Sequence, residues 1–229
     1  MTPPRALWLV PLIAGVAAPA DALDWSGGVG AVSDYRYRGG SLSGGRPAVQ
    51  ASVSVEHSSG VFAEAWASTL GHNDPFNSEV DFTGGLERQV APHLSLGGSA
   101  TYYSYSRDHA SNYVEATVQA TYSRGPSTLE LGVSIAPAQR GTRDSAGTRH
   151  ANRYVSATWE HRLSKCAALH AALGNERGPF DSVARGSKWD WKLGVELTHA
   201  PFKVGFDYVG SNADGDGRRA LVGSLFVNW

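Results

Sequence analysis

The chain has 229 residues, and its 20 Lys and Arg residues nearly balance its 21 Asp and Glu residues, for a formal net charge of −1 at pH 7. This balance argues against a nucleic-acid partner, because such partners are usually bound by a strongly basic surface. The one cysteine, Cys166, excludes an intramolecular disulfide, and the length fits a single domain.

Residues 1–22 have the composition of an export signal. Arg5 provides a positive start, residues 6–18 form an apolar stretch, and Ala20, Asp21 and Ala22 form a small-x-small cleavage site. The apolar stretch is too short to cross a bilayer as a helix, and no later run approaches the roughly 20 apolar residues that a membrane helix needs. We therefore expect an exported mature chain over residues 23–229, without a helical membrane span.

Apolar and polar residues alternate with a period of two from Trp25 almost to the C-terminus, as in strands whose successive side chains point to opposite faces. In the first segment Trp25, Val29, Tyr35 and Tyr37 share the apolar face, which extends the expected strand to Arg38. Clear segments follow at residues 49–56, 79–86, 114–121, 129–135, 188–197, 202–208 and 221–229, and weaker ones at 61–69, 94–105, 154–163 and 167–174. We count about twelve strands, each near the roughly 9–11 residues of a tilted membrane strand.

The connections between these segments alternate in length. The short ones are residues 57–60, 91–93, 124–127, 164–166 and 199–201, and the longer ones are 39–46, 71–77, 106–111, 137–152, 175–186 and 211–217. Bacterial barrels have short periplasmic turns and longer external loops. The rhythm therefore predicts such a barrel with both chain ends in the periplasm.

Aromatic residues collect at the strand ends, where the two membrane interfaces favour amphipathic rings. Toward the short turns lie Trp25, Tyr122, Phe202 and Trp229, and toward the longer loops lie Tyr35, Tyr37, Tyr113, Trp189 and Tyr208. The last segment also ends on Trp229, as in chains that the barrel-assembly machinery inserts. Together these features predict an all-β, antiparallel, up-and-down barrel of about twelve strands in the outer membrane of a Gram-negative bacterium. A secreted β-sandwich is the alternative, since its strands alternate as well.

Several stretches resemble the TorF family of outer-membrane porins. They are residues 33–43 (SDYRYRGGSLS), 47–50 (PAVQ) and 57–68 (HSSGVFAEAWAS), with further matches at 79–81, 102–105, 112–115 and 189–191. The similarity covers most of the mature chain. It implies a channel-like barrel in the outer membrane and brings no known substrate or catalytic residue. Gly40 stands where the family pattern has a bulky apolar residue, which predicts a looser first external loop.

If the alternation is right, charged side chains face an enclosed lumen. The acidic ones are Asp34, Glu56, Glu64, Glu79, Asp81, Glu87, Glu115, Glu130, Glu160, Asp190, Glu196 and Asp207, and the basic ones are Arg36, Arg38, Arg162, Lys188, Lys192, Lys203 and Arg218. Because acids outnumber bases and carboxylates bias a pore toward cations, we expect a narrow pore for small polar solutes with a weak cation preference. The alternative is a set of ion pairs that brace or plug the barrel.

Outside the cell we expect contact with membrane lipid and lipopolysaccharide. Arg140, Arg143 and Arg149 in the loop 137–152 suit lipopolysaccharide phosphates, although the pattern favours a solvated, mobile loop. Residues 212–217 match the opening of a calcium loop, but position 223 is Gly, so the closing acid of an EF-hand is missing. We predict no metal and no cofactor.

Two other functions compete with the porin. One is a non-conducting barrel with a structural or adhesive role. The other is a barrel lipid hydrolase, which needs a serine near a base that a third group orients. His57 and His199 lie near short turns, His170 in the expected lumen, and His72, His109 and His150 in external loops without a recognisable serine partner. We therefore predict that the protein is not an enzyme.

Overall fold

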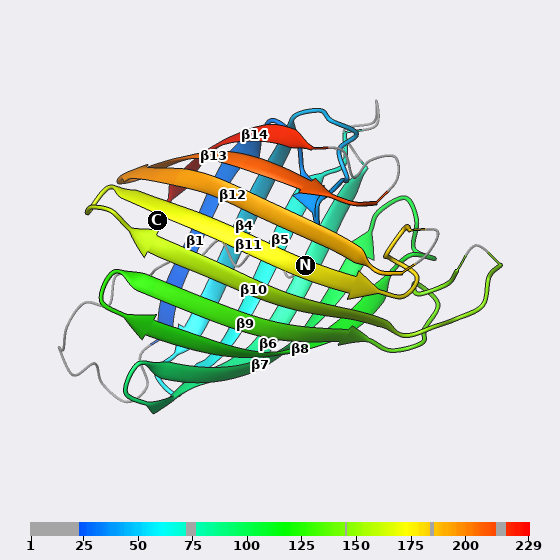
Figure 1. Ribbon diagram of the computed structural model, residues 1–229, viewed down its shortest axis with the longest axis horizontal. Helices are drawn as coiled ribbons and strands as arrows, with labels where there is room; N and C mark the ends of the chain where they lie inside the picture. The colour runs from blue at the N-terminus through cyan, green and yellow to red at the C-terminus, as the bar shows by residue number, and fades with distance from the viewer. Residues whose placement is uncertain (1–22, 72–76, 145, 184–185, 214–218) are drawn as a thin grey trace.

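The computed structural model describes residues 23–71, 77–144, 146–183, 186–213 and 219–229. Over these residues, twelve antiparallel strands close into one barrel in which every strand pairs with its neighbours in the chain and β1 pairs with β14 (Figure 1). No helix in these ranges is long and apolar enough to cross a membrane. The predicted class, a closed antiparallel barrel of about twelve strands, is confirmed, and the sandwich alternative is excluded.

The bounds of the strands follow the alternation closely. The barrel consists of β1 (Leu23–Val32), β4 (Ala48–His57), β5 (Val61–Thr69), β6 (Ser78–Ala91), β7 (Leu94–Tyr105), β8 (Tyr113–Arg124), β9 (Ser127–Ala136), β10 (Asn152–Arg162), β11 (Ala167–Arg177), β12 (Lys188–His199), β13 (Phe202–Ser211) and β14 (Ala220–Asn228). A separate two-residue pair consists of β2 (Arg36–Tyr37) and β3 (Gly40–Ser41). The weakly patterned segments at 61–69 and 94–105 have the predicted bounds.

The barrel closes where the two ends of the chain meet. The backbone N–H of Gly27 donates to the carbonyl of Trp229 at 3.2 Å, and that of Trp229 donates to Gly27 at 3.1 Å. A Cβ on Gly27 would lie 2.7 Å from the Trp229 ring, so the glycine leaves room for this indole. The seam therefore depends on a backbone pairing and on one small residue.

The outer face of the barrel is apolar. Leu221, Trp229, Trp25 and Val118 are 82%, 68%, 66% and 63% exposed, and many Leu, Val and Phe side chains join them. Such a continuous apolar surface is rare on a soluble monomer. Because side chains alternate along each strand, most charged residues of the strands lie on the inner face.

The connections differ at the two ends of the barrel, as Figure 1 shows. We call the end with the two- to four-residue turns the short-turn end and the other the loop end. The connection at residues 33–47 is longer than the predicted 39–46, because β1 ends at Val32. The expectation that Asp34, Arg36 and Arg38 lie on a barrel strand is therefore wrong, since apolar and polar residues continue to alternate past the end of the strand.

Candidate functional site: a loop folded into the lumen

The connection at residues 33–47, which we call the inner loop, folds back into the loop end of the barrel. β2 and β3 form a hairpin whose turn contains Arg38 and Gly39, with φ angles of 46° and 79°. A Cβ on Gly39 would lie 2.5 Å from the carbonyl oxygen of Gly210 on β13. The tip of the hairpin therefore touches the barrel wall, and glycine permits both the left-handed backbone and the close contact.

Arg38 connects this hairpin to two distant strands. Its Nη2 donates to Glu115 on β8 at 2.6 Å, and its Nη1 donates to Glu176 on β11 at 2.5 Å. The guanidinium also lies 3.9 Å from the ring centroid of Tyr154. Arg38 and Glu176 are 0% exposed and Glu115 is 1% exposed. Since β8 and β11 are not neighbours in the sheet, Arg38 joins them through the interior.

A second attachment of the inner loop is Tyr35. Its hydroxyl donates to Glu79 on β6 at 2.8 Å, and its ring packs against Trp66 on β5 with 5.2 Å between centroids. Tyr35 is 5% exposed. The expectation that Tyr35 belongs to an outer aromatic belt is wrong, because the chain turns inward after Val32.

Tyr37 and Tyr113, also expected in the outer belt, lie inside as well. The Tyr37 hydroxyl is 3.3 Å from that of Tyr113, whose ring stacks on Tyr103 with 4.4 Å between centroids. Tyr113 is 4% exposed and Tyr103 is 0% exposed. The other aromatics expected in belts, Trp25, Trp229, Tyr122, Phe202, Trp189 and Tyr208, do lie on the exposed outer face.

The inner loop is held in shape by its own side chains. Asp34 accepts hydrogen bonds from Arg36 Nε at 2.6 Å and from the hydroxyls of Ser41 and Ser43 at 2.5 and 3.1 Å. Ser43 also accepts one from the N–H of Tyr35 at 2.8 Å. These contacts connect the residues on either side of Gly40, and the looser loop expected from that residue stays a prediction.

Together the loop and the wall fill the lumen at the loop end. Every strand from β4 to β14 contributes an inner side chain that is at most 8% exposed: Ala48, Ser68, Glu79, Tyr103, Glu115, Ser134, Asn152, Glu176, Asp190, Val209 and Val222. These wall side chains are therefore shielded from solvent.

The short-turn half of the lumen is more open. Glu56 and Arg162 are exposed there, and Glu64, Glu87, Glu130, Lys192, Glu196 and Lys203 are partly exposed. Lys203 pairs with Glu196 at 2.9 Å, and Gln119 donates to Glu87 at 3.0 Å. Glu160 is 7% exposed. We call this half the vestibule.

The predicted lumenal residues therefore divide into two groups. At the loop end, the structure brings together Arg38, Glu115, Glu176 and Lys188, and Asp190 accepts a hydrogen bond from the hydroxyl of Tyr154 at 3.0 Å. Ion pairing of this kind is what the bracing alternative expected. In the vestibule the charged residues line an open space. Arg218 lies outside the described residues.

Sequence reasoning missed Glu176, Tyr103 and Tyr154. A signal was available, because Tyr154 has the same parity as Glu160 along β10 and therefore belongs to the inner face. The sequence pattern puts Glu176 in a connection, whereas β11 continues to Arg177, beyond the expected end at residue 174. The predicted signal peptide and most of the calcium-like segment lie outside the described residues. Within that segment Asn212 accepts a hydrogen bond from the N–H of Trp189 at 2.7 Å, which ties the loop to β12.

In the loop between β9 and β10, several hydrogen bonds converge on Asp144. Its carboxylate accepts hydrogen bonds from the N–H groups of Thr148 and Ala146 at 2.8 and 3.0 Å and lies 3.0 Å from His150 Nε2. The bond from Thr148, followed by the contact with His150, lowers the pKa of Asp144 from its ordinary value. The carboxylate therefore stays charged and holds the turn at neutral pH.

A serine and a histidine that could suggest a hydrolase meet at the short-turn end. Ser127 Oγ is 2.8 Å from His161 Nδ1, and the two residues are direct partners on β9 and β10. Among the described residues, no carboxylate or amide hydrogen-bonds this imidazole. The described residues also contain no group of three or more His, Cys, Asp and Glu side chains that could hold a metal ion.

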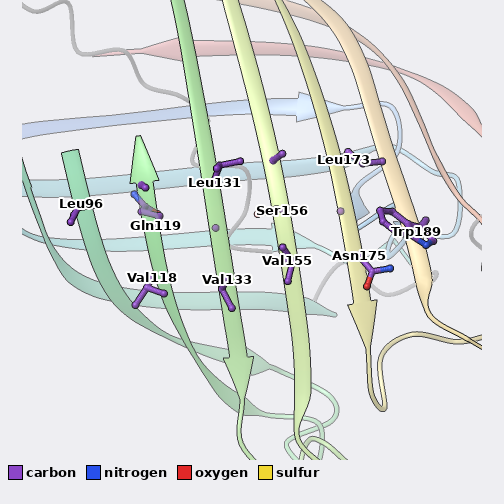
Figure 2. Close-up of a pocket in the computed structure, with 14 residues that line it drawn as sticks. Leu96, Val118, Gln119, Leu131, Val133, Val155, Ser156, Leu173, Asn175 and Trp189 are labelled. Atoms are coloured by element: carbon purple, nitrogen blue, oxygen red, sulfur yellow. The ribbon is translucent and has the colours of Figure 1, made fainter. Parts of the chain in front are cut away.

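A hollow of about 610 Å³ lies on the apolar outer wall over β7 to β12, not in the lumen. Figure 2 shows side chains along its strands, including Leu96, Val118, Leu131, Leu173 and Trp189. Its lining is almost entirely apolar, so it is continuous with the rest of the outer face. Gln119, Ser156 and Asn175 are the lining residues with an amide or hydroxyl side chain, and none of the lining residues is an acid or a base.

Comparison with solved structures shows barrels of this kind. The "KdgM porin" has a TM-score of 0.63 at 7% identity, covering 89% of this chain and 98% of that one. The "NanC porin" has a TM-score of 0.57 at 12% identity, covering 90% and 98%. The "COG4313 outer membrane channel from Pseudomonas putida F1" has a TM-score of 0.53 at 13% identity, covering 93% and 96%. At these identities the likeness shows a shared fold.

In sequence, no curated protein matches the chain. A family model described as "Bacterial protein of unknown function (Gcw_chp)" matches residues 16–223, which is most of the chain. The chain belongs to the Gcw_chp family of bacterial proteins, and its fold is a porin-like twelve-stranded barrel.

Proposed function

We propose that the protein is an outer-membrane porin through which small polar solutes diffuse passively along a narrow, charge-lined lumen. The observation that carries this proposal is the distribution of side chains, which is the reverse of that in a soluble protein. The outer face is apolar, and charged side chains are enclosed by the twelve strands. Charged side chains are tolerated inside a membrane barrel because water or opposite charges solvate them. The likeness to two porins and a channel, and the residues shared with the TorF family of porins, support the same function.

The proposal includes a location. Residues 1–22 would direct export and be removed, and the barrel-assembly machinery would insert the barrel through the strand that ends at Trp229. The exposed rings of Trp25, Tyr122, Phe202 and Trp229 would then meet the periplasmic interface, and the loop end would face lipopolysaccharide. Recovery in the outer-membrane fraction with Leu23 as the first residue is the expected result. A protein that stays in the soluble periplasmic fraction would contradict it.

We also propose a weak preference for cations. Eight acidic side chains face the vestibule, namely Asp24, Glu56, Glu64, Glu87, Glu130, Glu160, Glu196 and Asp207, against the basic Arg162, Lys192 and Lys203. Carboxylates that outnumber bases raise the local concentration of cations. The relevant solutes are therefore small and polar, and neutral or cationic.

The test is conductance. The purified mature chain, refolded in detergent and added to a planar lipid bilayer, is expected to produce discrete current steps, and heat-denatured protein is expected to produce none. Swelling of liposomes in neutral sugars of increasing size then measures the width of the path.

A non-conducting structural barrel is the second candidate, and the filled loop end favours it. The two candidates are distinguished by the unaltered chain, compared with a protein in which residues 36–45 are replaced by Gly-Ser-Gly-Ser. A porin conducts as the unaltered chain and conducts more once that segment is removed. A purely structural barrel does not conduct as the unaltered chain, whatever the replacement does.

A further inference from the structure

We propose that the inner loop is a gate, that the structure shows its closed state, and that Arg38 is the latch that holds it. This inference rests on the proposed porin function and adds to it the means by which passage is controlled. Arg38 reaches β8 and β11, Tyr35 reaches β6, and Gly39 touches β13. One short hairpin thus spans the cross-section of the lumen at the level where the inner side chains are shielded from solvent.

The loop is built to move as a unit. Many of its hydrogen bonds are internal, with Asp34 accepting from Arg36, Ser41 and Ser43. These bonds would survive if the hairpin left the lumen, so the loop need not unfold. The interactions that Tyr35, Arg38 and Gly39 make with the wall would break instead.

The base of the loop is a fixed hinge. Val32 and Ala48, which flank it, are direct partners on β1 and β4. Ser33 is tied to β14, since its N–H donates to the carbonyl of Gly223 at 2.8 Å and its Oγ accepts from the Gly223 N–H at 2.9 Å. The hairpin can therefore swing about residues near 33 and 47 while the twelve-stranded sheet keeps its register. Between β3 and β4, Gly44 and Gly45 have φ angles of 65° and 71°, a left-handed backbone conformation that few other residues adopt.

The latch is suited to reversible opening because it is ionic. A buried ion pair gains little net stability, since the attraction mainly offsets the loss of hydration. When the loop leaves, water enters the lumen and hydrates Arg38, Glu115 and Glu176 together. If apolar contacts held the loop instead, the water that enters on opening would not stabilise the separated side chains. The closed state is therefore favoured while the pair is intact, without being permanent.

The experiment compares single-channel recordings of four refolded proteins. They are the wild type, Arg38→Gln, the replacement of residues 36–45 by Gly-Ser-Gly-Ser, and Arg153→Gln as the matched control. Arg153 is exposed on the outer face of β10, so its substitution removes one positive charge without touching the lumen. A difference in SDS-gel migration between unheated and boiled samples reports whether each barrel has folded.

We expect Arg38→Gln to raise the open probability at least about tenfold over the wild type, because in the closed state Glu115 loses its cationic partner and Glu176 loses one of two. The loop replacement is expected to be open continuously, and Arg153→Gln to match the wild type. If folded wild type, Arg38→Gln and the loop replacement conduct equally, the gate is overturned while the porin stands. If none conducts, including the loop replacement, the porin function itself fails and the gate fails with it.

Discussion

His170 on β11 hydrogen-bonds to Asp207 on β13 across the strand that separates them, with 2.5 Å between Nε2 and Oδ1. Gly194 on β12 lies directly between the two, as the Cα partner of both. A Cβ at this position would overlap the Asp207 carboxylate and lie 2.5 Å from the imidazole. The pair exists because the middle strand has no side chain at that point.

We therefore expect Gly194→Ala to break the pair between His170 and Asp207 and to lower the free energy of unfolding by about 1–3 kcal/mol, as overpacking usually does. Urea titration of the protein refolded in lipid vesicles measures it. Gly223→Ala is the matched control, because a Cβ on Gly223 meets no atom within 4 Å. Equal effects of the two substitutions would show that the space over β12 is not the cause.

Arg38→Gln is expected to destabilise the barrel by about 3–5 kcal/mol, because Glu115 stays buried in the closed state without its cationic partner, while Glu176 keeps only Lys188 and Asn152. Adding Glu115→Gln to Arg38→Gln is expected to restore part of the loss, since a neutral amide needs no counter-charge. The urea midpoints of the single and double variants decide this. A double variant less stable than Arg38→Gln would contradict the ionic account.

Neutralising Asp81 is expected to change the free energy of unfolding in the opposite direction. It is 1% exposed, and neither of its carboxylate oxygens has a hydrogen-bond partner among the described residues. Burying a polar group without a partner costs about 1–3 kcal/mol, and more for a charge. Asp81→Asn is therefore expected to raise the free energy of unfolding, while Glu115→Gln lowers it. A loss of stability in Asp81→Asn would mean that the carboxylate has a partner after all.

If the barrel spans a membrane, the cost of an arginine on its outer face should depend on the depth of that residue in the bilayer. Val118 lies near the middle of β8 and is 63% exposed, and Leu221 lies at the loop end of β14 and is 82% exposed. In a bilayer, Val118→Arg is expected to cost about 2–4 kcal/mol and Leu221→Arg about 0–1 kcal/mol. Unfolding titrations in vesicles measure both. Two equally small effects would place the outer face in water.

The charge of the vestibule predicts its selectivity. Under a KCl gradient, the reversal potential of the loop replacement is expected to show a weak cation preference, and Glu56→Gln with Glu130→Gln is expected to reduce it. Asp144→Asn, the same change of charge in an external loop, is expected to leave it unaltered. An anion-selective pore would refute the cation preference.

The strands could be predicted from the sequence because, on most strands, the apolar side chains of the outer face alternate with polar residues or glycine. β5 and β7 have their predicted bounds even though their alternation is weak. The inner loop could not be predicted in this way. Asp34, Tyr35, Arg36 and Tyr37 continue the alternation past Val32, so the pattern alone cannot show that the chain has turned inward.

The partners of the loop were equally hidden. Arg38 meets Glu115 and Glu176, which lie 77 and 138 residues further along the chain, and no local pattern encodes that meeting. Sequence parity identified Glu115 as an inner residue, but it could not distinguish a carboxylate that lines open water from one that binds a guanidinium. That distinction depends on the position of the inner loop, which folds into the lumen beside Glu115.

The same separation orders events during folding. Arg38 cannot find both carboxylates until β8 and β11 curve around a common interior, and contacts so distant along a chain form late. We therefore expect the wall to assemble first, with the hairpin still outside the lumen. Entry of the hairpin is a final docking step, in which the inner loop fills the lumen of a barrel that has already closed.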